Sequence, residues 1–401
     1  MSLKAYLLTA IAIAIAIVLL GIGIYRTFFN LPVPKFLNTG RGRGDESTAQ
    51  DYYKQVGGVQ WSGQQCQGQR CTLAGWKSAN GFGSGGEVSA VYYNEGELGL
   101  ARDVHCREVN PVKVACYVTN YGSSFPADPL TSLSNAAAGQ NPRETLAIEA
   151  ARSFSREGDT WFFVYSAAPG NALLPSAQLD NEGEKSVPNI CQGCHGGEYA
   201  YDQKKFVGGT MLPFDVFTSS VLGPSGSVQK IGATAGAYQE AFRQLNGMVL
   251  DSRGRTIHFT SEPPTYTFGD PIRDLIVGWY DHCPTLSKPV NGSGLGGTTG
   301  CAADDTYLPP LWTAKPVLYQ TVVRRYCRSC HNTLDHGIEF TAWSQFEFWA
   351  NNSAGIVRLV CNIGGASWML MPNAEQTYAR FWSSSGHTDL ATQLGYPTCM
   401  Q

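Results

Sequence analysis

The feature that most constrains this chain is a five-residue pattern, Cys-x-x-Cys-His, which occurs twice in 401 residues. The residues that define the two copies are Cys191, Cys194 and His195, and Cys327, Cys330 and His331. Two thiols with this spacing can bond both vinyl groups of one porphyrin, and the histidine that follows can bind its iron. The sequence therefore predicts two haem c groups, each attached covalently through its own motif.

A Cys-x-x-Cys pair alone also occurs in zinc half-sites, in thioredoxin-like redox pairs and in structural disulfides. The chain contains 12 cysteines and 7 histidines. Chance is therefore a poor explanation for two copies of the full five-residue pattern, and haem attachment is the favoured interpretation.

The other cysteines form an even set of eight, which indicates disulfides and an oxidising compartment. Short separations along the chain favour three pairs and leave a fourth: Cys66 with Cys71, Cys106 with Cys116, Cys283 with Cys301, and Cys361 with Cys399. Buried free thiols are the alternative. Both kinds of cysteine predict an extracytoplasmic location, periplasmic or at the cell surface.

An apolar run covers residues 5–25, between Lys4 and Arg26. At helical rise such a run spans roughly 30 Å, which is enough to cross a bilayer. A cleaved signal peptide is the alternative, although its apolar core is usually shorter. We expect a transmembrane anchor over residues 1–26, followed by a linker rich in Gly, Arg and small polar residues over 27–50.

The expected fold class is mixed: the transmembrane helix, a β-containing, disulfide-stapled domain without haem, and then two mainly α haem modules. In the domain at 51–180, β-branched and aromatic runs predict strands at 88–93, 114–118 and 161–165. Residues 144–154 fit either a helix or a strand.

The two haem modules are expected at 181–300 and 301–401, and they differ in their approach to the motif. No amphipathic helix leads into Cys191, so the first module is atypical. Before Cys327, apolar residues recur at helical spacing. These are Leu318, Tyr319, Val322, Val323 and Tyr326.

Residues 305–401 resemble a class I cytochrome c domain, in which a helix with an aromatic residue near its end runs into the motif. Met371, followed by Pro372, is similar to that family's distal sulfur ligand, and 374–382 is similar to its closing helix. The resemblance implies that His331 and Met371 bind the iron of haem 2. Met369 is the rival for the distal position.

The distal ligand of haem 1 stays open between His105 and Met211. Met211 follows the glycines at 208 and 209, where a loop could fold its sulfur over the iron. His105 adjoins Cys106, and a bond from Cys106 to Cys116 would hold the imidazole rigidly. The chain also resembles a poorly characterised group of bacterial cytochrome-c-like proteins, for example over 98–106, and this resemblance favours the histidine.

The net charge of −3 and the lack of a basic run argue against a nucleic-acid partner. An iron with two protein ligands can exchange electrons but has no open position for a substrate. We therefore expect electron transfer with redox partner proteins, in a larger respiratory or extracellular assembly. A dihaem peroxidase, with haem 1 as the peroxide site, is the enzymatic alternative.

Overall fold

The protein is described here by a computed structural model. The structure describes residues 36–37, 46–63, 65–110, 113–151, 159–200, 205–233, 237–252, 271–283, 301–304, 306–333, 340–351, 355–356, 360–361, 374–396 and 399. All of them belong to one compact unit, Phe36–Gln401.

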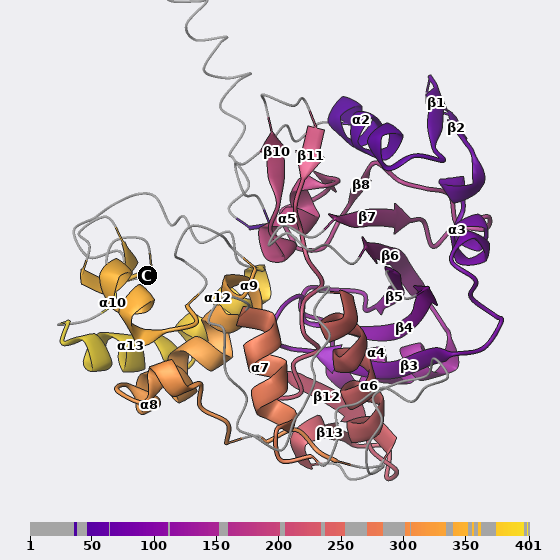
Figure 1. The fold of residues 1–401 in the computed structure, drawn as a ribbon. Coiled ribbons are helices and arrows are strands. Elements are labelled where there is room, and N and C mark those ends of the chain that lie inside the picture. The colour runs from indigo at the N-terminus through magenta and orange to yellow at the C-terminus, as the bar shows by residue number, and fades with distance from the viewer. Residues whose placement is uncertain are drawn as a thin grey trace, which may run out of the picture. The chain divides into compact units, whose positions relative to one another are not determined.

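A seven-stranded antiparallel sheet is the main structural element (Figure 1). Its strands, from one edge to the other, are β13 (Val228–Lys230), β12 (Ser219–Leu222), β3 (Glu87–Asn94), β4 (Leu100–Asn110), β5 (Lys113–Tyr121), β6 (Pro142–Ala151) and β7 (Asp159–Tyr165). The five strands from β3 to β7 pair in chain order, whereas β12 returns from much later in the sequence to pair with β3. The sheet therefore combines chain segments that precede and follow the first Cys-x-x-Cys-His motif.

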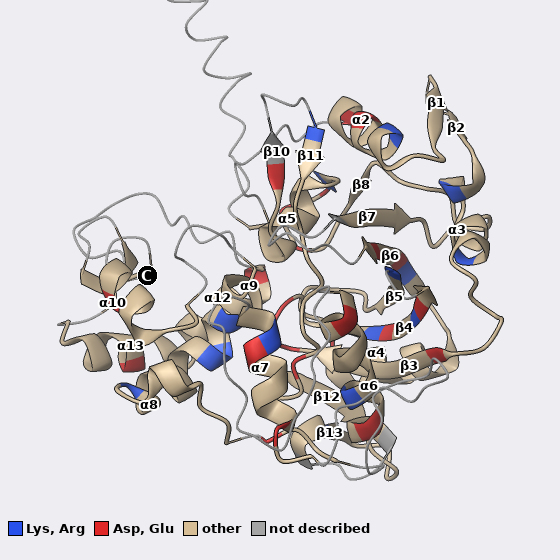
Figure 2. Ribbon diagram, viewed as in Figure 1, with Lys and Arg blue, Asp and Glu red and all other residues tan. Residues whose placement is uncertain are grey.

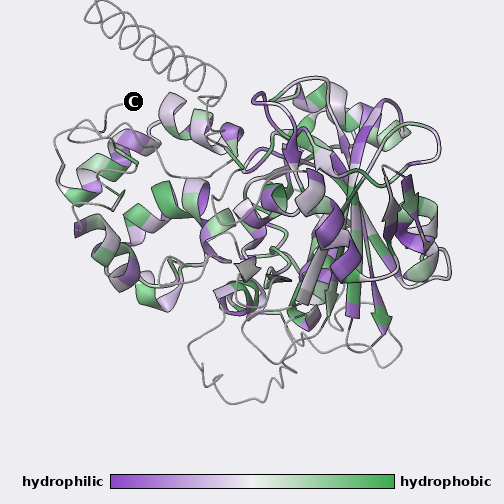
Figure 3. Ribbon diagram, turned by 90° about the horizontal axis from the view of Figure 1, so that it is seen from above, coloured by the Kyte–Doolittle hydropathy of each residue, from purple (hydrophilic) through white to green (hydrophobic). Residues whose placement is uncertain are grey.

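Helices cover both faces of the sheet. They are α3 (Leu73–Ala79) and α4 (Pro129–Ala138) on one face, and α6 (Ala237–Ser252) and α7 (Pro271–Tyr280) on the other. Side chains alternate between the two cores along the strands β3 and β5. Ala101 packs in the core with α3 and α4, while Val104 and Cys106 pack in the core with α6 and α7. Figure 3 shows the resulting mixture of hydrophobic and hydrophilic residues along strands and helices.

Short elements surround the sheet. They are α2 (Glu46–Val56), β1 (Gln60–Ser62), β2 (Gln65–Gln67), η1 (Gln69–Cys71), β8 (Ser176–Ala177), β9 (Lys185–Ser186), β10 (Glu198–Ala200), β11 (Lys205–Val207) and η2 (Ile231–Ala233). The hydroxyl of buried Tyr52 in α2 accepts a hydrogen bond from the Phe162 backbone N–H at 2.7 Å. The helix α2 is thereby fixed to the edge strand β7.

The described C-terminal elements are all helical and form a separate aromatic core. They are η3 (Pro310–Trp312), α8 (Pro316–Leu318), η4 (Tyr319–Cys327, a π-helical stretch), α9 (Arg328–His331), α10 (Trp343–Asn351), α12 (Glu375–Ser383) and α13 (Gly386–Leu394). Fully buried Trp312 packs edge-on against Phe346. The helix predicted to lead into Cys327 is confirmed as the run from α8 through η4, and the predicted closing helix is α12.

All four predicted disulfides are present: Cys66–Cys71, Cys106–Cys116, Cys283–Cys301 and Cys361–Cys399. The three predicted strands are also confirmed, as β3, β5 and β7, and the ambiguous segment at 144–154 contributes to the strand β6. Residues 100–110, for which no strand was predicted, form the long strand β4.

The predicted fold class is wrong: a large antiparallel sheet is the main element, and two mainly α haem modules are not evident. The region 181–300 is not a separate α module, because its strand β12 extends the large sheet and its helices α6 and α7 pack on that sheet. The first motif lies on a short helix between the strands β9 and β10. A Cys-x-x-Cys-His pattern specifies only about one helical turn, so it does not determine the fold of its surroundings.

The predicted membrane localisation is also corrected. Within the residues that the structure describes, no helix has both the length and the apolar character needed to cross a membrane. The expected anchor at residues 1–26 lies outside the described residues.

A buried carboxylate connects the sheet to the α3 region. Glu149 in β6, with a side chain only 4% exposed, accepts hydrogen bonds from Arg70, Asn80 and Lys113 at 2.6–3.1 Å. Burial alone would raise the pKa of Glu149, but these donors outweigh it and hold that pKa below its ordinary value. The ionised form therefore stabilises the fold.

We predict that Glu149→Gln lowers the free energy of unfolding by on the order of 2 to 3 kcal/mol at pH 7, because two cations lose their partner. The lowered pKa means that this contribution is full above the ordinary carboxyl pKa of 4.5 and disappears as pH falls through the native value. Urea unfolding at pH 7 and pH 3 should therefore show a smaller difference at pH 3. Glu144→Gln, on the same strand but 20% exposed, is the control and should change little.

Candidate functional site

The first motif lies on the helix α5 (Asn189–His195), which follows the strand β9 directly. Cys191 and Cys194 are free thiols on this helix. Gly196 ends the helix with φ +70°, a conformation that favours glycine. The adjacent Gly197 has φ +89°, and any Cβ there would lie 2.9 Å from the Val207 carbonyl oxygen. The two glycines thus allow the chain to turn away immediately after His195.

The imidazole of His195 has a fixed orientation. Its Nδ1 lies 2.7 Å from the Thr210 carbonyl oxygen, which can only accept, so Nδ1 carries the proton. The Thr210 N–H in turn donates to the His195 carbonyl at 2.9 Å. Burial lowers the pKa of His195, partly offset by the Thr210 contact, so the neutral ring is favoured. The lone pair therefore resides on Nε2, which is the tautomer that a metal-binding histidine needs.

A cavity of about 120 Å³ adjoins this helix. Its walls come from the sheet, from α5 and from the loop after β11. Lining residues include Tyr92, Arg102, Cys116, Val118, Ile148 and Phe162; Ile190, Cys191, Cys194 and His195; and Met211, Leu212, Pro213, Phe214 and Asp215.

The cavity wall also contains polar groups. Arg102 forms an ion pair with Glu97 at 3.2 Å, and both side chains are less than 15% exposed. Burial alone would lower the pKa of Arg102, but Tyr92 and Glu97 raise it, so the guanidinium stays charged. Two buried polar atoms of the wall, Arg102 Nε and Asn94 Oδ1, lack a protein partner among the described residues. A ligand with both apolar and polar parts fits these surroundings.

The second motif spans the junction between η4 and α9. His331 is 6% exposed, and its ring stacks on Phe340 at 3.9 Å between centroids and 10° between planes. Burial raises the pKa of the Cys327 thiol to about 12. Met371 and Met369, the candidates for the distal ligand of the second iron, lie outside the described residues.

The two motifs are in direct contact. The sulfur atoms of Cys194 and Cys330 lie 3.7 Å apart, and the Thr333 hydroxyl donates a hydrogen bond to the Cys194 carbonyl. The pKa of the Cys330 thiol is raised, first by its hydrogen bond with Cys194 and then by burial. Residues separated by more than a hundred positions in sequence thus form one site.

His105 does not line the cavity that contains His195. Along β4 it lies an odd number of residues from Arg102, so its side chain is on the opposite face of the sheet. Its Nδ1 contacts Glu87 and its Nε2 lies 3.1 Å from Asp103, so both ring nitrogens are occupied. Burial would lower the pKa of His105, but these carboxylates raise it.

Met211 is brought to the cavity wall and is 2% exposed. It directly follows Thr210, which hydrogen-bonds to His195 twice. These hydrogen bonds hold the backbone just before Met211 next to His195. Of the two candidates for the distal ligand of haem 1, Met211 alone is near His195.

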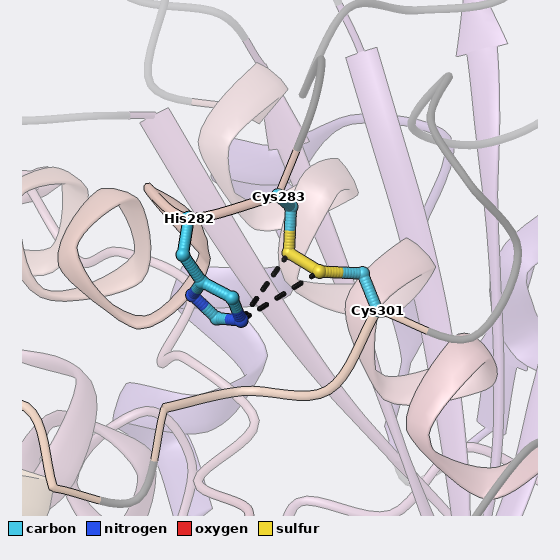
Figure 4. A group of neighbouring side chains, drawn as sticks. All are labelled: His282, Cys283 and Cys301. Carbon is cyan, nitrogen blue, oxygen red and sulfur yellow. Dashed lines mark hydrogen bonds between the residues drawn. A yellow bond between two sulfur atoms is a disulfide. The ribbon is translucent and has the colours of Figure 1, made fainter.

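A further group of possible metal ligands is formed by His282, Cys283 and Cys301 (Figure 4). His282 Nε2 lies 3.9 Å and 3.7 Å from the two sulfurs, but these sulfurs are joined in a disulfide. Zinc binds cysteine as the thiolate, which a disulfide does not provide. The group is therefore a disulfide with a neighbouring histidine.

Sequence reasoning missed Thr210, Phe340 and the Glu97–Arg102 pair. Thr210 acts through its backbone, so its side-chain type gives no signal. The glycines at 208 and 209, with φ +72° and +97°, were the available sign of a sharp turn there. Phe340 lies nine residues after His331, and no periodic sequence pattern predicted that their rings would stack.

We predict that Gly196→Ala destabilises the contact between the motifs. An added Cβ would lie 2.5 Å from the Thr333 carbonyl oxygen, whereas Gly183, with a similar positive φ of +96°, has open space around it. Gly183→Ala should cost about 1 kcal/mol from backbone strain alone, and Gly196→Ala about 1 to 3 kcal/mol more from the overlap. Equal losses in urea unfolding would contradict the close approach.

Comparison of the chain with protein-family models, with curated proteins and with solved structures finds no match.

Proposed function

We propose that the protein transfers electrons through two covalently attached c-type haems. The observation that supports this most strongly is the arrangement at His195. A neutral imidazole, with Nδ1 held by Thr210 and the Nε2 lone pair free, directly follows the free thiol of Cys194 at the wall of a mainly apolar cavity. This is the set of groups that c-type haem attachment needs.

The residues present fit a haem group. Cys191 and Cys194 would attach the first porphyrin and Cys327 and Cys330 the second. Each thiol would add across one vinyl double bond, so that a sulfur–carbon bond forms, the thiol proton moves to the neighbouring carbon, and no oxidant is consumed. The mainly apolar wall would cover the macrocycle, and Arg102 Nε could donate a hydrogen bond to a propionate.

A four-cysteine zinc site is the competing interpretation, because two Cys-x-x-Cys pairs meet in space. A zinc cage needs its ligand atoms close to one another. Only one group of three or more His, Cys, Asp or Glu side chains in the described part of the chain has ligand atoms within 4.8 Å of each other, and it contains none of the four motif cysteines. Burial also raises the pKa values of Cys191 and Cys327, which disfavours thiolates.

Bound haem would supply one-electron redox chemistry at its iron. The chain's own residues would hold it and exclude water. His195, which is partly buried, and His331, which is buried, would provide the proximal nitrogens. Each packs against a phenylalanine: the Phe162 and His195 ring centroids lie 5.0 Å apart, and Phe340 stacks on His331. Acidic and basic residues are interspersed along the visible elements (Figure 2).

We predict two covalent haems per chain after expression with a haem c maturation system. Intact mass and the alkaline pyridine spectrum would measure the number. The double substitution Cys191→Ser with Cys194→Ser should leave one haem, as should Cys327→Ser with Cys330→Ser, whereas Cys66→Ser with Cys71→Ser, which removes only a disulfide, should leave two. A protein with no covalent haem would disprove the proposal, and peroxide turnover by the holoprotein would support a dihaem peroxidase instead.

We further predict that His105→Ala leaves the ligand-sensitive absorption bands of the holoprotein unchanged, because the ring lies on the far face of the sheet. Met211→Ala changes the cavity wall beside His195 and should alter those bands. Absorption and electron paramagnetic resonance spectra of the ferric protein would measure the effect. A new high-spin signal in His105→Ala alone would contradict this placement.

A further inference from the structure

The contact between the two motifs joins equivalent positions. Cys194 and Cys330 are each the second cysteine of their motif, and their sulfur atoms lie 3.7 Å apart. If both sulfurs are thioethers, each is joined to the edge of its own macrocycle through a single carbon. The helices α5 and α9 that present them are held against each other by the Thr333 hydrogen bond to the Cys194 carbonyl.

From this contact, and resting on the proposed function, we propose that the two haems form one coupled pair, joined edge to edge at Cys194 and Cys330. We also propose that Arg328 and Asp215 are the positioning residues that hold this spacing. Electrons entering at either haem are then shared within the chain before they leave it. The two haems act as one unit with two irons rather than as separate carriers on one polypeptide.

Arg328 links the second motif to the wall of the first cavity. It lies inside the pattern Cys327-Arg-Ser-Cys-His331 and is 3% exposed. Its Nη2 and Nε donate to Asp215 Oδ2 at 2.5 Å and 3.1 Å. Asp215 is 8% exposed and lines the cavity beside His195. A buried, charge-assisted pair of this kind fixes the relative position of the two segments that bear it.

The guanidinium of Arg328 is held in place by its other neighbours. Its Nη1 donates to the Tyr319 hydroxyl at 3.3 Å, and its Cζ lies 5.1 Å from the Trp279 ring centroid and 5.4 Å from that of Phe217. These contacts come from η4, from α7 and from the segment before β12. Because these groups surround the planar Arg328 guanidinium on several sides, they oppose small rotations of α9 relative to the first cavity.

A second set of hydrogen bonds supports the same arrangement from the turn between β3 and β4. The Gly96 carbonyl accepts from the Thr377 hydroxyl at 2.7 Å, and the Glu95 carbonyl accepts from Arg380 Nη1 at 2.8 Å. Both donors belong to α12 in the helical C-terminal region. The same turn contributes Glu97 to the first cavity. The two haem regions are thus connected at two places.

The first test uses the unmodified holoprotein and circular dichroism in the Soret region. Two porphyrins in edge contact couple their transitions, so we expect a couplet of opposite signs centred on the absorption maximum. The reference is the sum of the spectra of the two single-haem proteins, Cys191→Ser with Cys194→Ser and Cys327→Ser with Cys330→Ser. A wild-type spectrum that equals this sum would overturn the proposal.

The second test addresses the positioning residues. Arg328→Gln and Asp215→Asn should each reduce the couplet while two haems remain bound. Arg324→Gln is the matched control, because its guanidinium lies 5.3 Å from the same Phe217 ring on the preceding helical turn, and it should retain the couplet. An unchanged couplet in both Arg328→Gln and Asp215→Asn would remove their positioning role.

The pyridine spectrum of each sample separates the two proposals. Two covalent haems without a couplet disprove the coupled pair and leave electron transfer intact. A preparation without covalent haem disproves the proposed function itself.

Discussion

The alternation of side chains across the antiparallel sheet is the constraint on which the rest of the structure depends. One face bears the cavity beside His195, and the other bears His105 with its two carboxylates. Shifting β4 by one residue against β5 would exchange the two sets. The disulfide between Cys106 and Cys116 joins residues that are directly opposite in the ladder, so it fixes this register.

Local signals in the sequence predicted the local parts of the fold. Short cysteine separations predicted three disulfides correctly and left the fourth pair. Runs of β-branched and aromatic residues predicted three strands of the sheet, and the spacing of apolar residues predicted the helix before Cys327. The non-local parts were not predictable in the same way. The strand β12 pairs with β3 from more than a hundred residues away, and nothing within its four residues specifies that partner.

The residues of the candidate site were also predictable only in part. Its cysteines and histidines are evident from the spacing of the motifs, whereas Thr210 contributes a backbone oxygen and Arg328 acts through a distant aspartate. For His105, the disulfide predicted beside it is present, but it could not say which face of the sheet the ring occupies. Only the register of β4 decides that.

The 3.7 Å separation of Cys194 and Cys330 also has a consequence for how the protein is assembled. Two free thiols at that distance need to move only slightly to reach the roughly 2.05 Å of a disulfide bond. In a haem-free chain that already contains four disulfides, a dithiol oxidant would act on this pair as well. If the two sulfurs carry haem as proposed, porphyrin attachment must therefore protect them before the chain closes around them.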